Sequence, residues 1–110
     1  AHAGIGLGHE FLRHVERAGI LVHVVEPAPA DGSDPLINYR AIRDELVRYD
    51  ERLGRRPEIV VVSKAELPGA DDIRAALAAA IGREVIAVSA VTGQGLDRLL
   101  AAIVTQLDAP

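Results

Sequence analysis

The sequence predicts an α/β fold in which a parallel sheet of three strands lies between flanking helices, in three layers. Short apolar runs rich in β-branched residues alternate along the chain with longer segments whose apolar residues recur every three or four positions. Glycine, proline or aspartate separates most of these runs from the next. Strands that alternate with helices form parallel sheets with right-handed crossovers, so the expected order is one helix followed by three strand–helix units.

Composition narrows the class of protein. The 110 residues are enough for one domain or part of one, and because 49% are hydrophobic but only 3% aromatic, the core must be aliphatic. A net charge of −4 argues against a nucleic-acid-binding surface on this chain. The absence of cysteine excludes disulfides and thiolate metal sites and is compatible with a cytoplasmic location. No apolar run is long enough to span a membrane.

The first expected helix follows a glycine-rich start and carries Phe11, Leu12 and Val15 on one stripe, with Gly19 as its C-cap. Residues 20–25 are a β-branched run, which predicts the first strand. This strand is apolar enough to expect neighbours on both sides, yet a narrow sheet leaves it with one. The pattern is that of half of a larger α/β domain.

The second helix is expected after a loop at residues 27–34. Asp34 and Pro35 are a typical N-cap and first-turn pair, and Gly54 is expected to end the helix. Apolar side chains three or four positions apart predict a buried stripe on it: Leu36, Tyr39, Ile42, Leu46, Tyr49 and Leu53.

The second half of the chain repeats the pattern of strand, polar turn and helix. Residues 59–62 predict a strand buried on both faces, and residues 71–81 predict the helix behind it. Residues 85–88 predict the last strand. The final helix carries its apolar residues on one face: Leu96, Leu99, Leu100, Ile103 and Leu107.

Two polar turns, at residues 63–66 and 89–93, follow the second and third strands. Ligands of open α/β sheets bind in the crevice at the carboxyl ends of the strands, so the two turns together predict a pocket for a base or nucleotide. Taken alone, residues 63–66 are better explained as a plain connection between strand and helix. His23 and Glu26 lie within and at the end of the first strand, and we expect both to have structural roles.

Several segments together make the chain resemble the C-terminal half of the GTPase domain of the Obg family (Obg/CgtA-type P-loop GTPases). Residues 1–17 are similar to the glycine-rich switch II segment of that family and the helix after it. Residues 21–25 and 38–46 resemble the strand and the helix that follow. The turns at residues 63–66 and 89–93 fall where the family has its two guanine-recognition motifs. The first segment is specific to the family, whereas the short motifs are shared by many GTPases.

The resemblance implies a P-loop NTPase-like fold, of which residues 1–110 are about half. Residues 1–18 would be a remnant of switch II, and residues 20–107 the half that recognises guanine. The resemblance also implies a cytoplasmic GTPase that uses GTP, GDP and Mg²⁺, hydrolyses GTP slowly, and acts as a switch in assembly of the large ribosomal subunit. A flexible terminus is the simpler alternative for the glycines of the switch-like segment, which are Gly4, Gly6 and Gly8.

The specificity motif of such GTPases is Asn-Lys-x-Asp, and this chain has Ser-Lys-Ala-Glu at residues 63–66. By resemblance, Glu66 accepts hydrogen bonds from the two N–H donors of guanine, through a side chain one methylene longer than that of aspartate. The stem of Lys64 covers the base plane, and the N–H of Ala90 donates to guanine O6. Ser63 is shorter than asparagine, so we expect a weakened guanine preference. The implied guanine-binding residues are Ser63, Lys64, Glu66, Ser89, Ala90 and Val91.

Phosphate-binding residues are missing from the sequence. No Gly-x-x-x-x-Gly-Lys-Ser/Thr pattern occurs, so no catalytic residue and no metal ligand is assigned to this chain. By the resemblance these parts lie upstream of Ala1, and we expect no GTP hydrolysis by this chain alone. The alternatives are a non-catalytic α/β interaction module with a degenerate nucleotide site and, more weakly, a flavodoxin-like receiver domain. A reading frame that continues upstream into a phosphate loop would favour the GTPase.

Overall fold

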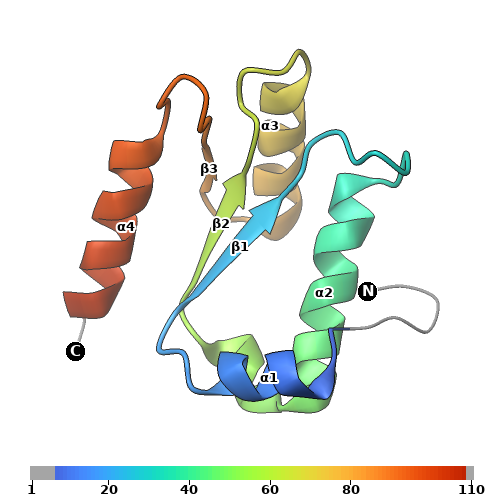
Figure 1. Cartoon of the computed structure of the whole chain (residues 1–110), viewed down its shortest axis with the longest axis vertical. Coiled ribbons are helices and arrows are strands. Elements are labelled where there is room, and N and C mark those ends of the chain that lie inside the picture. The colour runs from blue at the N-terminus through green and yellow to red at the C-terminus, as the bar shows by residue number, and fades with distance from the viewer. Residues whose placement is uncertain (1–6, 109–110) are drawn as a thin grey trace.

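The computed structural model describes residues 7–108, which form one three-stranded parallel sheet in the order β1–β2–β3 (Figure 1). The strands are β1 (Leu21–Val25), β2 (Glu58–Val62) and β3 (Val85–Ala87). Val25 lies opposite Val62, and Val62 lies opposite Ala87, so all three strands end at the same level. The predicted parallel α/β architecture is confirmed, and the two predicted polar turns leave the sheet at one edge.

Helices cover both faces of the sheet, in three layers (Figure 1). α2 and α3 lie on one face and α4 on the other, while α1 and a short 3₁₀ helix, η1, pack against the last turns of α2. The helices are α1 (His9–Glu16), α2 (Pro35–Tyr49), η1 (Glu51–Arg55), α3 (Ala70–Ile81) and α4 (Leu96–Asp108).

Successive residues of β2 point to opposite faces, so this central strand contributes to two separate cores. The core under α2 and α3 contains Val25, Tyr39, Val60, Val62, Leu77 and Val85. The core under α4 contains Ile59, Val61 and Ile86, against which Leu99 and Ile103 pack. Residues 59–62 are at most 7% exposed, which confirms the prediction of a strand buried on both faces.

The start of α2 follows the prediction made from local sequence. The Asp34 carboxylate accepts a hydrogen bond from the backbone N–H of Leu36 (2.8 Å), and Pro35 is the first helical residue. An N-cap of this kind satisfies a backbone donor that has no partner inside the helix. The cap fixes where α2 begins after the loop that follows β1.

The end of α2 differs from the prediction. The helix ends at Tyr49 instead of continuing to Gly54, because Asp50 adopts an extended backbone conformation (φ −158°). The Asp50 carboxylate accepts a hydrogen bond from the backbone N–H of Arg52 (2.9 Å) and contacts its guanidinium (2.7 Å), which starts η1 as a separate element. Leu53 is nevertheless fully buried, so the apolar stripe is confirmed although the helix ends early.

Two other apolar stripes are only partly covered. Phe11, on the apolar stripe of the first helix, is 52% exposed. α1 ends at Glu16 with Arg17 as its C-cap, so the prediction of Gly19 as the cap is wrong. In α4, Leu99 and Ile103 pack on the sheet as expected. Three further residues of the predicted α4 face are exposed: Leu96, Leu100 and Leu107. Periodicity identifies an apolar face, but a sheet this narrow covers only part of it.

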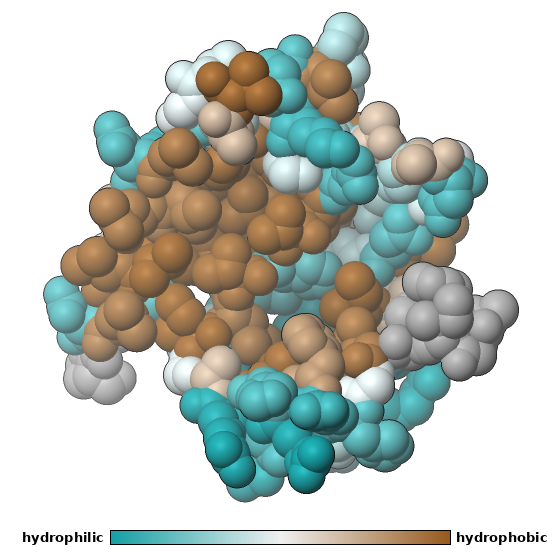
Figure 2. Space-filling model, in the orientation of Figure 1, coloured by the Kyte–Doolittle hydropathy of each residue, from teal (hydrophilic) through white to brown (hydrophobic). Residues whose placement is uncertain are grey.

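β1 is an edge strand, and within residues 7–108 it pairs with β2 alone. Val22 and Val24 alternate with the inward-facing residues of β1 and are 39% and 57% exposed. Figure 2 shows that apolar residues gather over β1 and α4 on this face of the molecule. The expectation that the first strand has a single neighbour is confirmed, and an apolar surface lies next to its open edge.

Candidate functional site

The turn after β2, residues 63–66, is held between the ends of the two outer strands. On the β1 side, the backbone N–H of Ser63 donates to the carbonyl of Val25 (3.0 Å), and the Ser63 hydroxyl lies 3.4 Å from the same oxygen. On the β3 side, the N–H of Ala65 donates to the carbonyl of Val88 (3.0 Å). The turn therefore continues the hydrogen bonding of the sheet beyond the strands, and Ser63 braces it against β1.

Side chains of this turn make a second set of contacts with the same two neighbours. The Ser89 hydroxyl donates to Glu66 Oε1 (2.7 Å), so the structure brings these two predicted residues together. On the other side, the Lys64 ammonium pairs with the carboxylate of Glu26, the residue that follows β1. The hydrogen bond from Ser89 lowers the pKa of Glu66 below its usual value, so this carboxylate is ionised at neutral pH.

Lys64 has an unusual backbone. Its φ of 53° lies in the left-handed region, and among residues 7–108 it is the sole residue other than glycine with a positive φ. Such a conformation costs free energy and persists where the surroundings enforce it, which is frequent in binding sites. The hydrogen bond to Glu26 raises the pKa of Lys64, so this ammonium stays charged at neutral pH.

The turn after β3 is organised around Ser89, which is fully buried. Its hydroxyl accepts a hydrogen bond from the N–H of Thr92 (3.0 Å), and its carbonyl accepts one from the N–H of Gly93 (2.8 Å). Ala90 and Val91 project outward at the tip, and Val91 is 80% exposed. Among residues 7–108, no hydrogen bond is formed by the N–H of Ala90, the residue that follows Ser89.

Together these residues place the Glu66 carboxylate and the backbone of Ala90 at the same edge of the sheet. Ser89 donates to Oε1 of Glu66, and an ionised carboxylate has about four lone-pair positions with which it can accept further hydrogen bonds. The arrangement suits a planar ligand that presents adjacent N–H donors next to a carbonyl oxygen. Both of the predicted turns are therefore brought to one site.

The switch-like segment lies mostly beyond what the structure describes. Gly4 and Gly6 fall outside residues 7–108, so the prediction for them is not tested. Gly8 precedes α1 with a φ of 83°, and its carbonyl accepts a hydrogen bond from the N–H of Leu12 (3.0 Å). A positive φ suits glycine at this position, where the chain turns into the helix.

Sequence reasoning missed a cluster of charged groups at the opposite end of the sheet. Glu58, the first residue of β2, has a side chain that is 2% exposed. Its carboxylate accepts a hydrogen bond from the Tyr39 hydroxyl (2.9 Å), lies 3.3 Å from an Arg43 nitrogen, and pairs with Arg83. His23 Nδ1 lies 3.3 Å from the same carboxylate, a contact that fits the structural role expected of His23.

Burial by itself raises the pKa of Glu58, but the hydrogen bonds from His23, Arg83 and Tyr39 overcome it and hold the pKa at about 2. The His23 and Tyr39 rings also stack, with centroids 4.6 Å apart. The cluster joins β1, α2, β2 and the turn before β3. It lies at the amino ends of the strands, away from the two turns, so we assign it a structural role.

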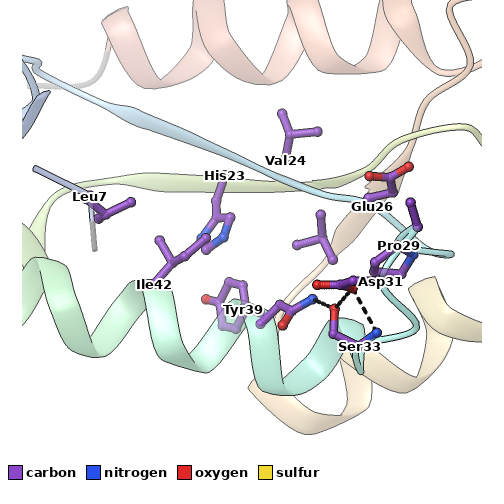
Figure 3. A pocket seen from close by; sticks show the side chains of 12 residues that line it. Leu7, His23, Val24, Glu26, Pro29, Asp31, Ser33, Tyr39 and Ile42 are labelled. Carbon is purple, nitrogen blue, oxygen red and sulfur yellow. Dashed lines mark hydrogen bonds between the residues drawn. The ribbon is translucent and has the colours of Figure 1, made fainter. Parts of the chain in front are cut away.

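A hollow of about 540 Å³ lies between β1, the following loop and α2 (Figure 3). Its polar groups bond to one another, since the Asn38 amide donates to the Ser33 hydroxyl (2.8 Å), which in turn donates to Asp31 (2.6 Å). Glu26 lies at its rim, but none of the predicted guanine-binding residues lines it. The hollow is therefore separate from the candidate site.

Across residues 7–108, no group of three or more His, Asp or Glu side chains is arranged to hold a metal ion. In the same part of the chain, no helix has both the length and the apolar character needed to cross a membrane.

Comparison with known proteins finds relatives named GTPase Obg, while no family model matches the chain. The chain is 52% identical over 102 residues to the GTPase Obg of Desulforudis audaxviator. This match covers 91% of the chain and 24% of the relative. It is 46% identical to the GTPase Obg of Alkaliphilus oremlandii, covering 97% of the chain and 26% of the relative. It is 43% identical to the GTPase Obg of Desulfatibacillum aliphaticivorans, covering 100% of the chain and 33% of the relative.

The chain thus spans about a quarter to a third of the length of these relatives, and the match runs along nearly all of its own length. Matches of this length cover the whole half-domain rather than a short motif. The resemblance drawn from the sequence is confirmed. Over the segment that it spans, the chain belongs to the Obg family of GTPases.

Proposed function

We propose that this chain is the guanine-recognising half of a GTPase domain that binds GTP and GDP. The observation that supports it best is the contact between Ser89 and Glu66 (2.7 Å), which holds a carboxylate at the carboxyl edge of the sheet. Two turns that are 23 residues apart in sequence meet there, as a nucleotide pocket in an open α/β sheet requires.

Glu66 supplies the discrimination between bases. Guanine presents two neighbouring N–H donors to a carboxylate, whereas adenine has no such pair and would leave a charged acceptor without partners. The N–H of Ala90 would donate to the guanine carbonyl, and the Lys64 stem would cover the base. Ser63, whose hydroxyl is turned toward β1, would act by holding the turn in place.

The remaining parts of the cycle are assigned to the longer protein. Residues 7–108 provide no group of side chains suited to Mg²⁺, and the sequence has no phosphate loop. We therefore derive no hydrolytic step from this chain. Slow GTP hydrolysis, Mg²⁺ binding, a cytoplasmic location and a role in assembly of the large ribosomal subunit are proposed for the whole protein, by analogy with the GTPase Obg relatives.

The boundaries of the proposed half-domain are residues 1–110, with a switch II remnant at residues 1–18 and the guanine-recognising part at residues 20–107. The open edge of β1 and the apolar face over β1 and α4 support the assignment as half of a larger domain, because further strands and a helix would cover both (Figure 2).

The half-domain proposal predicts that the 110-residue chain alone is marginally stable or self-associates through its open edge. The physical reason is that Val22, Val24 and Leu100 stay in contact with water instead of being buried. Thermal unfolding and sedimentation of the isolated chain would test this. A monomer that unfolds cooperatively at an ordinary domain temperature would contradict the prediction.

The proposed function is tested by calorimetric titration of the natural full-length protein with GDP and, separately, with ADP. We expect binding of GDP only, and Glu66→Ala should weaken it by about 10- to 100-fold, the range for a lost hydrogen bond to a charged group. Glu84→Ala is the matched control, because Glu84 is an exposed carboxylate paired with Arg98 at the other end of β3. Equal binding of GDP and ADP would contradict guanine recognition.

A non-catalytic interaction module remains the second candidate, and the departures from the guanine motif favour it. If neither nucleotide binds, Ser63→Asn combined with Glu66→Asp separates the two explanations. Restored GDP binding would place the defect in the motif. Continued failure would support the interaction module.

A further inference from the structure

Glu26 lies outside the predicted guanine-binding set, yet it contacts that set directly. It follows β1, and its carboxylate pairs with the ammonium of Lys64, which is 38 residues away in the chain. In Figure 3 the Glu26 carboxylate points away from Ser33 and Asp31. The direction fits its contact with the turn after β2 rather than a role in the hollow.

Lys64 lies within electrostatic reach of two carboxylates. It pairs with Glu26, and its charge also contributes to lowering the pKa of Glu66. The side chains of Glu26 and Lys64 are 44% and 54% exposed, so neither packing nor burial locks the lysine in place. Without Glu26, Glu66 is the neighbouring acid toward which the ammonium would turn.

We infer that Glu26 is a positioning residue for base recognition: by binding the Lys64 ammonium, it keeps that cation from occupying the Glu66 carboxylate. The inference rests on the proposed guanine-binding function and assigns a role to a residue outside the recognition motif. An ammonium on Glu66 would compete with the two N–H donors of guanine for the same oxygens, one of which already accepts from Ser89.

The same contact orients the lysine stem. The left-handed backbone at Lys64 sets where the side chain leaves the turn, and the ion pair sets where it ends, at β1. Between those two points the aliphatic stem crosses the edge of the sheet. Glu26 therefore has two effects on the site: it leaves Glu66 available to accept from the base, and it orients the Lys64 stem to cover the base.

The test is GDP affinity of the natural full-length protein carrying Glu26→Gln, Glu26→Asp or Glu84→Gln. We expect Glu26→Gln to weaken GDP binding about two- to fivefold, the range for half-exposed ion pairs, and Glu26→Asp to restore it. Glu84→Gln is the control, because it removes an exposed carboxylate from an ion pair far from the turns. In a Lys64→Met background, Glu26→Gln should have no further effect, since the competing cation is gone.

Two outcomes separate this inference from the proposed function. If the unmodified protein does not prefer GDP to ADP, the proposed function fails and the positioning role is overturned with it. If it prefers GDP but Glu26→Gln binds as tightly as Glu84→Gln, the positioning role alone is overturned.

A measurement without nucleotide gives an independent readout. The pKa of Glu66, followed through its carboxylate carbon by NMR, should fall in Glu26→Gln as Lys64 turns toward it, and should not change in Glu26→Asp. A residue that only stabilised the fold would leave this pKa where it is. An unchanged pKa of Glu66 in Glu26→Gln would overturn the proposal.

Discussion

Replacing Glu58 by glutamine is expected to lower the free energy of unfolding by about 2–4 kcal/mol. The Glu58 side chain is 2% exposed and accepts from groups on three other segments, so its loss leaves Arg43 and the Tyr39 hydroxyl facing an uncharged amide. The expected loss is smaller than for a fully buried ion pair, because Arg83 is 45% exposed and solvent screens its charge. Denaturant unfolding of the full-length protein measures the effect.

Glu84→Gln is the control for this experiment, since Glu84 is 66% exposed and forms a surface pair with Arg98. Its replacement should change the free energy of unfolding by less than about 1 kcal/mol. If Glu58→Gln lowers the free energy of unfolding no more than Glu84→Gln does, the role assigned to the Glu58 cluster is contradicted.

The same cluster predicts a pH dependence. The pKa of Glu58 is about 2 in the folded state, below its ordinary value of 4.5. An acid whose pKa is lower in the folded state stabilises that state at pH values above its ordinary pKa. The contribution of Glu58 is therefore complete above about pH 5 and is lost as the pH falls toward 2. The stability difference between the unmodified protein and Glu58→Gln should therefore shrink between pH 5 and pH 2.

Gly95→Ala is expected to destabilise the protein by about 2–5 kcal/mol, from a strained backbone and a direct clash. Gly95 has a φ of 78°, and a Cβ added there would lie 2.0 Å from the carbonyl oxygen of Ala87, the last residue of β3. The backbone on one side must move, and β3 leads directly into Ser89. Guanine binding should therefore weaken together with stability, as measured by GDP calorimetry and denaturant unfolding.

Gly93 is the matched control in the same turn. It has a similar φ of 84°, but nothing lies within 4 Å of an added Cβ. Gly93→Ala should cost only the backbone strain, about 1–2 kcal/mol. Equal losses for the two variants would show that backbone strain, rather than close approach to β3, sets the requirement for glycine at Gly95.

The sequence by itself determined the features that depend on neighbouring residues. The β-branched run at residues 59–62 predicts a doubly buried strand, and Asp34 before Pro35 predicts the start of α2; both are confirmed. The positions of the two polar turns follow from the ends of the strands, and the parallel sheet then brings them to one edge. These features could be predicted because each depends on a period, a cap or a turn within a few residues.

Tertiary structure decided the contacts between residues far apart in the chain. Glu58 meets His23 across 35 positions, and Lys64 meets Glu26 across 38. No local pattern indicates which side chain each of these acids contacts. The exposed side of α4 likewise depends on how much sheet is present to cover it. Periodicity shows which face of a helix is apolar. Which surface packs on that face is set by the free energy of packing the whole chain, so it is seen only in the assembled fold.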